Sequence, residues 1–436
     1  MSGLLEDLAR RQGDRERPFL IGPNETLSFA QIEESSRRED PRLDGIKQGD
    51  IVAVIGDFDA DSIALSFRLL DMGAILMPLT HGTEADHEYF FESGFAQYVI
   101  RGDDRETRKK RSATESNDLI DEIRQRVHPG IIFFSSGTTG RPKAILHDFQ
   151  NFVAKFATPR PSLRTLNFLL FDHAGGINTL LHTLFNKGVV IVPAERAPER
   201  IASDMQTHSV ELLPATPTFL RMMLLAGVFD ADYQSLRVIT YGTERMDQST
   251  LDTLCAKLPG VDFRQTYGLS ELGVFHVRSR ARDSLWMKIG GEGIETRIVD
   301  KVLHIRSANR MLGYLNAPSP FIDGWYDTGD IVEEEDGFIK VVGRAKEVIN
   351  VGGLKILPGE VERIALLYPG VLRAKAHGVT NPITGQHIEL IAEPAPGAKV
   401  ERRELMAHFR AHLQKQLCPH RITIAAVPVS HRFKQQ

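Results

Sequence analysis

Apolar runs of strand length alternate with amphipathic segments of helix length along the first half of the chain. The continuous apolar run at 51–57 (IVAVIGD) predicts a buried strand. The segment 62–73 (SIALSFRLLDMG) has apolar residues at helical spacing and predicts a helix that ends at Gly73. A second apolar run at 74–79 (AILMPL) predicts another strand. This strand–helix–strand order is typical of α/β folds.

The same order returns twice further along the chain. Two more strand–helix–strand units are predicted, the first at 165–171, 178–185 and 188–193, the second at 210–214, 216–227 and 236–242. Glycines stand where several of these elements end, as turns require. The sequence therefore predicts an α/β fold in which mostly parallel sheets are covered by helices.

The remainder of the chain predicts a second, smaller domain of mixed α+β structure. The segment 401–417 (ERRELMAHFRAHLQKQL) places apolar residues on one face of an amphipathic helix. We expect a large domain over residues 1–343 and a small C-terminal domain over residues 344–436.

Charge and cysteine content narrow the range of partners. The chain has 53 Lys and Arg against 57 Asp and Glu, and the basic residues form no broad cationic stripe, so we expect no nucleic-acid partner. Cys255 and Cys418 are far apart and fit neither a disulfide framework nor a zinc site.

The sequence has no signal peptide and no apolar run of membrane-spanning length, so we expect a cytoplasmic protein without a membrane span. Its oligomeric state, monomer or homodimer, stays open.

A phosphate-binding loop is predicted directly after an apolar run. In 131–145 (IIFFSSGTTGRPKAI), small hydroxylated residues and glycines let backbone N–H groups and hydroxyls converge on an anion. The residues expected to bind ATP phosphates are Ser135, Ser136, Gly137, Thr138, Thr139, Gly140 and Lys143. The spacing differs from that of a Walker loop, and the segment alone is also compatible with a surface turn.

Several motifs, in the same order, resemble those of one enzyme superfamily. SSGTTGRPK is similar to the signature loop of the adenylate-forming superfamily of acyl-CoA synthetases, peptide-synthetase adenylation domains and luciferases. It is followed by QTYGLSE at 265–271, GWYDTGD at 324–330 and GRAKEVINVGGLKILPGEVE at 343–362. The resemblance spans most of the chain. The loop stands closer to the amino terminus than in longer members, so we expect an abbreviated N-terminal part.

The 265–271 motif supplies three side chains suited to a nucleotide. Tyr267 offers a flat face for adenine, Ser270 a hydroxyl for phosphate, and Glu271 a hard carboxylate suited to Mg²⁺. A buried tyrosine beside a helix-starting Ser/Glu pair is the alternative interpretation of the motif by itself.

Further nucleotide contacts are expected from three other segments. Asp330 follows a glycine turn and can accept hydrogen bonds from both ribose hydroxyls, although a turn-capping role is equally compatible with its position. Arg344 resembles the family's second ribose or phosphate contact. Gly242 and Gly268 complete the expected ATP site, and Gly242 permits close approach of the backbone.

The resemblance implies that the small domain moves between two half-reactions. Lys346 falls where the family places its hinge, and Gly352 and Gly353 would line the entrance for a thiol. The catalytic lysine of adenylation matches Lys434 by its spacing, although Phe433 replaces the family's glycine. A cation there would stabilise the charge that develops when a carboxylate attacks the α-phosphorus.

The acid pocket is expected around a histidine and its neighbouring glycines. His173, with Gly175 and Gly176, resembles the pattern of acyl and aryl members, whereas amino-acid-activating members use an aspartate, which keeps Asp172 as an option. The expected pocket comprises Asp172, His173, Gly176, Tyr241, Thr243 and Gly268. The expected catalytic residues are Lys434, Glu271 and His173.

These assignments imply an ATP- and Mg²⁺-dependent acid–thiol ligase. It would convert a small aryl or acyl carboxylic acid to its acyl-adenylate, release pyrophosphate, and transfer the acyl group to the phosphopantetheine thiol of coenzyme A or a carrier protein. Three alternatives stay open: a stand-alone enzyme that activates an amino acid, an oxidase or amide-forming ligase, and a catalytically silent nucleotide-binding homologue.

Overall fold

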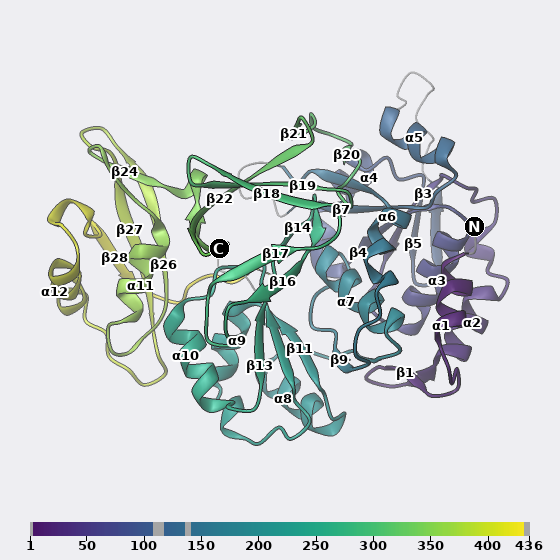
Figure 1. The fold of residues 1–436 in the computed structure, drawn as a ribbon, viewed down its shortest axis with the longest axis horizontal. Helices are drawn as coiled ribbons and strands as arrows, with labels where there is room; N and C mark the ends of the chain where they lie inside the picture. The colour runs from purple at the N-terminus through teal and green to yellow at the C-terminus, as the bar shows by residue number, and fades with distance from the viewer. Residues whose placement is uncertain (1–2, 108–116, 136–140, 431–436) are drawn as a thin grey trace.

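Two seven-stranded sheets form the body of the chain in the computed structural model, which describes residues 3–107, 117–135 and 141–430 (Figure 1). The first sheet has the order β13 (Asp262–Gln265), β12 (Val238–Tyr241), β11 (Leu212–Ala215), β9 (Arg164–Leu166), β10 (Val189–Ile191), β1 (Pro18–Ile21), β2 (Thr26–Ser28). The second has the order β20 (Gly313–Tyr314), β8 (Ala144–Asp148), β7 (Gly130–Phe134), β4 (Ile75–Leu79), β3 (Ile51–Ile55), β5 (Tyr98–Arg101), β6 (Asp104–Thr107). The first is parallel except at β2, and the second is parallel at its centre. The predicted α/β fold is confirmed.

Helices connect and cover these strands. They are α1 (Leu4–Arg11), α2 (Phe29–Arg37), α3 (Ala60–Asp71), α4 (His87–Ser93), α5 (Asp118–Arg126), α6 (Phe149–Ala154), α7 (Ala174–Phe185), α8 (Pro198–Thr207), α9 (Pro217–Leu225) and α10 (Gln248–Lys257). The unit β3–α3–β4 follows the sequence prediction, with every residue of both strands buried and Gly73 at φ +74° after the helix. The strand predicted over 165–171 is shorter. It ends at Leu166, and Phe168 and Phe171 then enter two different hydrophobic clusters.

A third, antiparallel sheet lies between the body and the C-terminal part (Figure 1). Its order is β16 (His276–Ser279), β17 (Met287–Gly290), β23 (Phe338–Arg344), β22 (Trp325–Glu335), β19 (Val302–Ser307), β18 (Ile294–Val299), with β21 (Phe321–Ile322) paired to β22. A separate hairpin joins β14 (Gly268–Leu269) to β15 (Gly273–Val274). Many residues of this sheet are only partly buried, so they do not form the continuous apolar runs that reveal the buried parallel strands.

The C-terminal part has its own mixed sheet and its own core. The strands are β25 (Leu354–Ile356), β24 (Ile349–Val351), β27 (Gly385–Pro394), β26 (Val371–Asn381) and β28 (Arg421–Ile424), and the helices are α11 (Pro358–Leu366) and α12 (Arg402–His412). Leu405 and Phe409 of α12 are fully buried, as predicted. The helix is shorter than 401–417, because Leu413 adopts an extended conformation.

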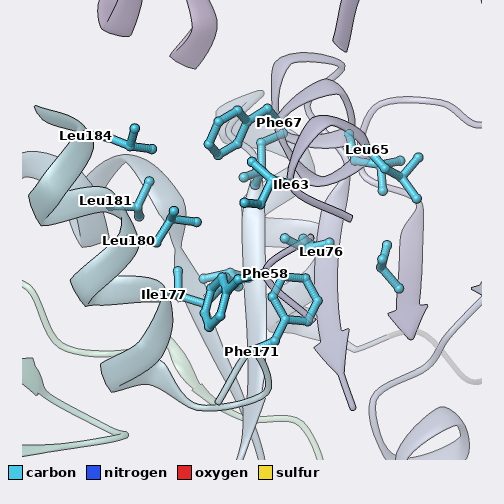
Figure 2. Close-up of a cluster of buried hydrophobic side chains, with 14 of the residues drawn as sticks. Phe58, Ile63, Leu65, Phe67, Leu76, Phe171, Ile177, Leu180, Leu181 and Leu184 are labelled. Atoms are coloured by element: carbon cyan, nitrogen blue, oxygen red, sulfur yellow. The ribbon is translucent and has the colours of Figure 1, made fainter. Parts of the chain in front are cut away.

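Helix α7 packs into the largest hydrophobic cluster, which contains side chains from strands of both seven-stranded sheets. Figure 2 shows Ile177, Leu180 and Leu181 of α7 on the side of the cluster that faces Phe58 and Phe171. The rings of Phe58 and Phe171 meet edge to face with centroids 5.3 Å apart. Since α7 begins next to His173, this packing holds the expected acid pocket against the core.

We predict that Leu184→Ala in α7 lowers the free energy of unfolding by about 2–5 kcal/mol, because the fully buried side chain would leave a cavity. Leu225→Ala is the matched control, since Leu225 is 41% exposed, and should change the free energy of unfolding by only about 0.5 kcal/mol. Urea unfolding of both variants tests this prediction. Equal losses would contradict the role assigned to the α7 core.

Candidate active site

The two ends of the predicted phosphate loop are held together at the edge of the second sheet. The Ser135 N–H donates to the Lys143 carbonyl oxygen at 3.1 Å, and the Lys143 N–H donates to Ser135 Oγ at 3.0 Å. These contacts continue the β7–β8 ladder and close the base of the loop. The loop residues Ser136, Gly137, Thr138, Thr139 and Gly140 lie outside the described residues.

A tyrosine that the sequence analysis missed joins this loop to the expected metal ligand. The Tyr314 hydroxyl donates to Glu271 Oε1 at 2.6 Å, and Lys143 Nζ lies 4.5 Å from the centroid of the Tyr314 ring. Burial, and then the neighbouring Glu271 carboxylate, raises the pKa of Tyr314, so its hydroxyl remains a donor. A single tyrosine in a two-residue strand leaves no sequence signal, because only the pairing of β20 with β8 brings it here.

The 265–271 motif forms a tight hairpin against β8. Gly268 pairs with Val274, and a side chain at Gly268 would meet the Gly273 carbonyl oxygen at 2.7 Å. His147 Nε2 donates to the Ser270 carbonyl oxygen at 2.6 Å. The strand that follows the phosphate loop therefore also positions the residue before Glu271.

Asp330 is 5% exposed and is held by residues of two other motifs. Its Oδ2 accepts a hydrogen bond from the Tyr267 hydroxyl at 2.6 Å, and its Oδ1 accepts one from Arg344 Nε at 3.1 Å. Burial, and then the Asp330 carboxylate, raises the pKa of Tyr267 well above its usual range. The Tyr267 ring stacks on Phe275 at a centroid distance of 6.2 Å. The hydroxyl of Tyr267 thus has a structural role, since it supports the buried Asp330 carboxylate.

Several residues predicted for the acid pocket lie at or just before the first turn of α7. His173 caps the helix, and its Nδ1 accepts a hydrogen bond from the Gly175 N–H at 3.0 Å. A side chain at Gly176 would lie 2.1 Å from the Leu170 carbonyl oxygen, so this position requires glycine. Asp172 is 3% exposed, whereas His173 is partly accessible.

Just after β12, Gly242 lies close to Thr266, and the backbone of Thr243 is strained. A side chain at Gly242 would lie 2.1 Å from Thr266 Oγ1, and Thr243 has φ +67°, which β-branched residues seldom adopt. Tyr241 is 1% exposed, and burial raises its pKa. Glu244 Oε2 accepts a hydrogen bond from the Thr218 N–H at 3.2 Å.

The predicted hinge and thiol residues lie in short connections of the C-terminal part. Lys346 is exposed in a 3₁₀ turn (Ala345–Glu347) between the third sheet and the C-terminal sheet. Gly352 and Gly353, at φ +60° and +91°, form the two-residue turn of the β24–β25 hairpin, which is the conformation that Gly-Gly favours. Lys434 lies outside the described residues.

A surface cavity of about 520 Å³ lies in the N-terminal part, away from all of these motifs. Its wall includes Arg42, which pairs with Asp40 at 2.7 Å and with Asp61 at 2.6 Å. None of the residues predicted for the nucleotide or the acid lines it, so we do not assign it to the active site.

The described residues contain no group of three or more His, Cys, Asp or Glu side chains that could hold a metal ion by themselves. A single carboxylate such as Glu271 fits Mg²⁺ that is bound mainly through substrate phosphates. Over the same residues, no helix is long and apolar enough to cross a membrane.

The fold is that of adenylate-forming enzymes, and the base of the predicted loop, the hairpin and the buried Asp330 belong to the motifs that resemble theirs. The chain belongs to the AMP-binding enzyme family, whose model matches residues 5–315. The resemblance inferred from the motifs is thereby confirmed.

The relatives of the chain include ligases with two kinds of acceptor. A fatty acid–[acyl-carrier-protein] ligase, MmaC of Mycobacterium marinum, is 29% identical over 346 residues, which cover 68% of this chain and 65% of the relative. The chain thus spans less than two thirds of that ligase. An oxalate–CoA ligase of Arabidopsis thaliana is 25% identical over 489 residues, which cover 97% of this chain and 94% of the relative. The structure of the anthranilate CoA ligase AuaEII with anthranoyl-AMP has a TM-score of 0.82 at 17% identity, covering 100% of this chain and 95% of that chain, which shows a shared fold.

We predict that Tyr314→Phe weakens binding of Mg-ATP by about 1 kcal/mol, because Glu271 loses the hydroxyl that orients it. Tyr368→Phe is the matched control, since the Tyr368 hydroxyl makes a similar 2.7 Å contact with Glu404 in the C-terminal part. The thermal shift produced by Mg-ATP should shrink in Tyr314→Phe and stay unchanged in the control. An equal shift in both variants would show that Tyr314 does not position Glu271.

Proposed function

We propose that the protein activates a carboxylic acid with ATP to form an acyl-adenylate and pyrophosphate, and then transfers the acyl group to a phosphopantetheine thiol. The observation that supports this best is the contact between Tyr314 and Glu271 beside Lys143, in a chain of the AMP-binding family. It brings together Lys143, at the end of the predicted phosphate loop, and Glu271, the carboxylate expected to bind Mg²⁺. The relatives include ligases for a carrier protein and for CoA, which supports an acid–thiol ligase. Either of these two acceptors is compatible with the proposal.

In this proposal, ATP is held by its phosphates and its ribose from opposite ends. The loop from Ser135 to Lys143 binds the phosphates, and Ser270 lies beside it. Asp330 and Arg344 bind the ribose, since Asp330 keeps acceptor capacity beyond its two present hydrogen bonds. Mg²⁺ bound between Glu271 and the phosphates would neutralise charge on the reacting phosphate groups.

The acid reacts next to the start of α7. Its carboxylate attacks the α-phosphorus, and Lys434 stabilises the negative charge that spreads over the reacting oxygens. His173 is the accessible member of the Asp172–His173 pair, which favours an acid without an α-amino group, because an ammonium would need an exposed Asp172. Gly176, Gly242 and the strained Thr243 shape the adjoining wall.

The C-terminal part would then rotate about Lys346. This rotation would move Lys434 away from the acid site and bring the thiol entrance at Gly352 and Gly353 to it. In the present arrangement, Arg245 bridges the two parts of the chain. Its Nη1 donates to the Val342 carbonyl oxygen at 2.7 Å, and its Nη2 lies 1.6 Å from where a side chain at Gly359 would begin. The rotation must release the contact with Gly359 and can keep the contact with Val342, which precedes the hinge.

We predict acid-dependent exchange of pyrophosphate into ATP in the presence of Mg²⁺, across a panel of aryl, fatty, hydroxy and amino acids. Exchange requires the reversible formation of an acyl-adenylate, so it tests the first half-reaction without knowledge of the acceptor. Glu271→Gln should abolish the exchange. ATP binding without exchange for every acid would favour a silent nucleotide-binding homologue.

We predict that Lys434→Ala slows adenylate formation by at least about a hundredfold and slows thiol transfer from a supplied acyl-adenylate far less, because Lys434 serves only the first half-reaction. Lys399→Ala is the control, since this lysine of the small domain is 86% exposed. Single-turnover measurements of both half-reactions test the assignment. Equal losses in the two steps would reject it.

A further inference from the structure

Behind the 265–271 hairpin lies a buried ammonium group, that of Lys155, which pairs with no carboxylate of the described residues. Lys155 begins a 3₁₀ turn (Lys155–Ala157) after α6, and its Nζ lies 3.4 Å from the Val274 carbonyl oxygen. The same Nζ is 5.0 Å from the ring centroid of Phe152 and 5.2 Å from that of Phe156. Within the described part of the chain, no carboxylate forms an ion pair with Lys155, and burial alone accounts for its lowered pKa of about 7.

Two histidines, His182 and His147, lie close to Lys155, and both are neutral at pH 7. Burial, with smaller contributions from Arg160 and Lys155, lowers the pKa of His182 to about 4. Burial likewise lowers the pKa of His147 to about 4, with a contribution from Lys155. A buried cation without a partner costs free energy, and replacing it with an apolar side chain of similar size is often stabilising. The Val274 carbonyl oxygen and the two aromatic rings contact the Lys155 ammonium, but they do not supply the counter-charge that a buried cation lacks.

Lys155 lies between the 265–271 hairpin and α7. Its Nζ would lie 3.8 Å from a side chain at Gly273, which together with Val274 forms β15 of the hairpin that carries Glu271. His182 lies on α7, nine residues or about 14 Å beyond His173. The two elements that adjoin Lys155 thus also carry residues assigned to the acid pocket.

We infer that Lys155 binds a second carboxylate on the acid substrate, at the end away from the carboxylate that is adenylated. This inference rests on the proposed function and narrows its substrate class to dicarboxylic acids. A second carboxylate would give the ammonium a charge-assisted hydrogen bond in a site of low polarity. His182, neutral at pH 7, can donate another hydrogen bond from its ring.

The test is pyrophosphate exchange with pairs of acids that differ only in the second carboxylate. The pairs are succinate and butyrate, adipate and hexanoate, suberate and octanoate, and isophthalate and benzoate. We expect wild-type protein to prefer the dicarboxylic member of at least one pair by about tenfold or more in kcat/KM. In Lys155→Met this ratio should fall by about tenfold, mainly through KM for the dicarboxylic acid, and Lys155→Arg should restore part of it.

Lys257→Met is the matched control, because Lys257 pairs with Asp230 on the surface and should leave the ratio unchanged. Lys155→Met should also raise the thermal unfolding midpoint of the ligand-free protein, whereas a lysine with a purely structural role would lower it. If Lys155→Met does not fold, the preference of wild-type protein for the dicarboxylic acids and the behaviour of Lys155→Arg test the inference.

The outcomes separate this inference from the proposed function. Exchange with monocarboxylic acids and no preference for any dicarboxylic partner would overturn the inference and uphold acid activation. An unchanged ratio in folded Lys155→Met would do the same. The absence of exchange with every acid, in protein that binds ATP, would overturn both.

Discussion

The buried carboxylate of Asp330 is the interaction on which the arrangement of the site depends. A charge that is only 5% exposed must be compensated, and here the donors come from Tyr267 and Arg344. Tyr267 precedes the hairpin that carries Glu271, and Arg344 ends the last strand before the turn that contains Lys346. One carboxylate thereby ties the nucleotide motifs to the connection about which the small domain is proposed to rotate.

Two further hydrogen bonds, from the second sheet, hold the hairpin. Tyr314 and His147 both contact it from the second sheet, the first through the Glu271 carboxylate and the second through the Ser270 carbonyl oxygen. Both donors are largely buried, so their hydrogen bonds do not compete with bulk water. Glu271 is therefore oriented before any metal or nucleotide binds, which reduces the entropy lost on binding.

The residues proposed to surround the acid include backbone strain and a buried polar group without a hydrogen bond in the described structure, and both are energetically unfavourable. Thr243 has a backbone conformation that favours glycine, and the buried Tyr241 hydroxyl has no hydrogen-bond partner among the described residues. Lys155 adds a buried cation that forms no ion pair within the part of the chain that the structure describes. Strain and unsatisfied polar groups are often found at functional sites, and those at the end of β12 agree with the proposed placement of the acid.

The sequence by itself determined the α/β class, the order of the motifs and the family, because buried parallel strands and glycine-rich loops are encoded by short contiguous segments. It did not reveal the third sheet, whose strands are only partly buried and lack a continuous apolar run. Tertiary structure alone decided that Tyr314 supports Glu271 and that Tyr267 is bonded to Asp330, since these partners are 43 and 63 residues apart. It likewise placed Lys155 behind β15, because the chemistry of a lysine depends on which distant groups surround it, and no local pattern records them.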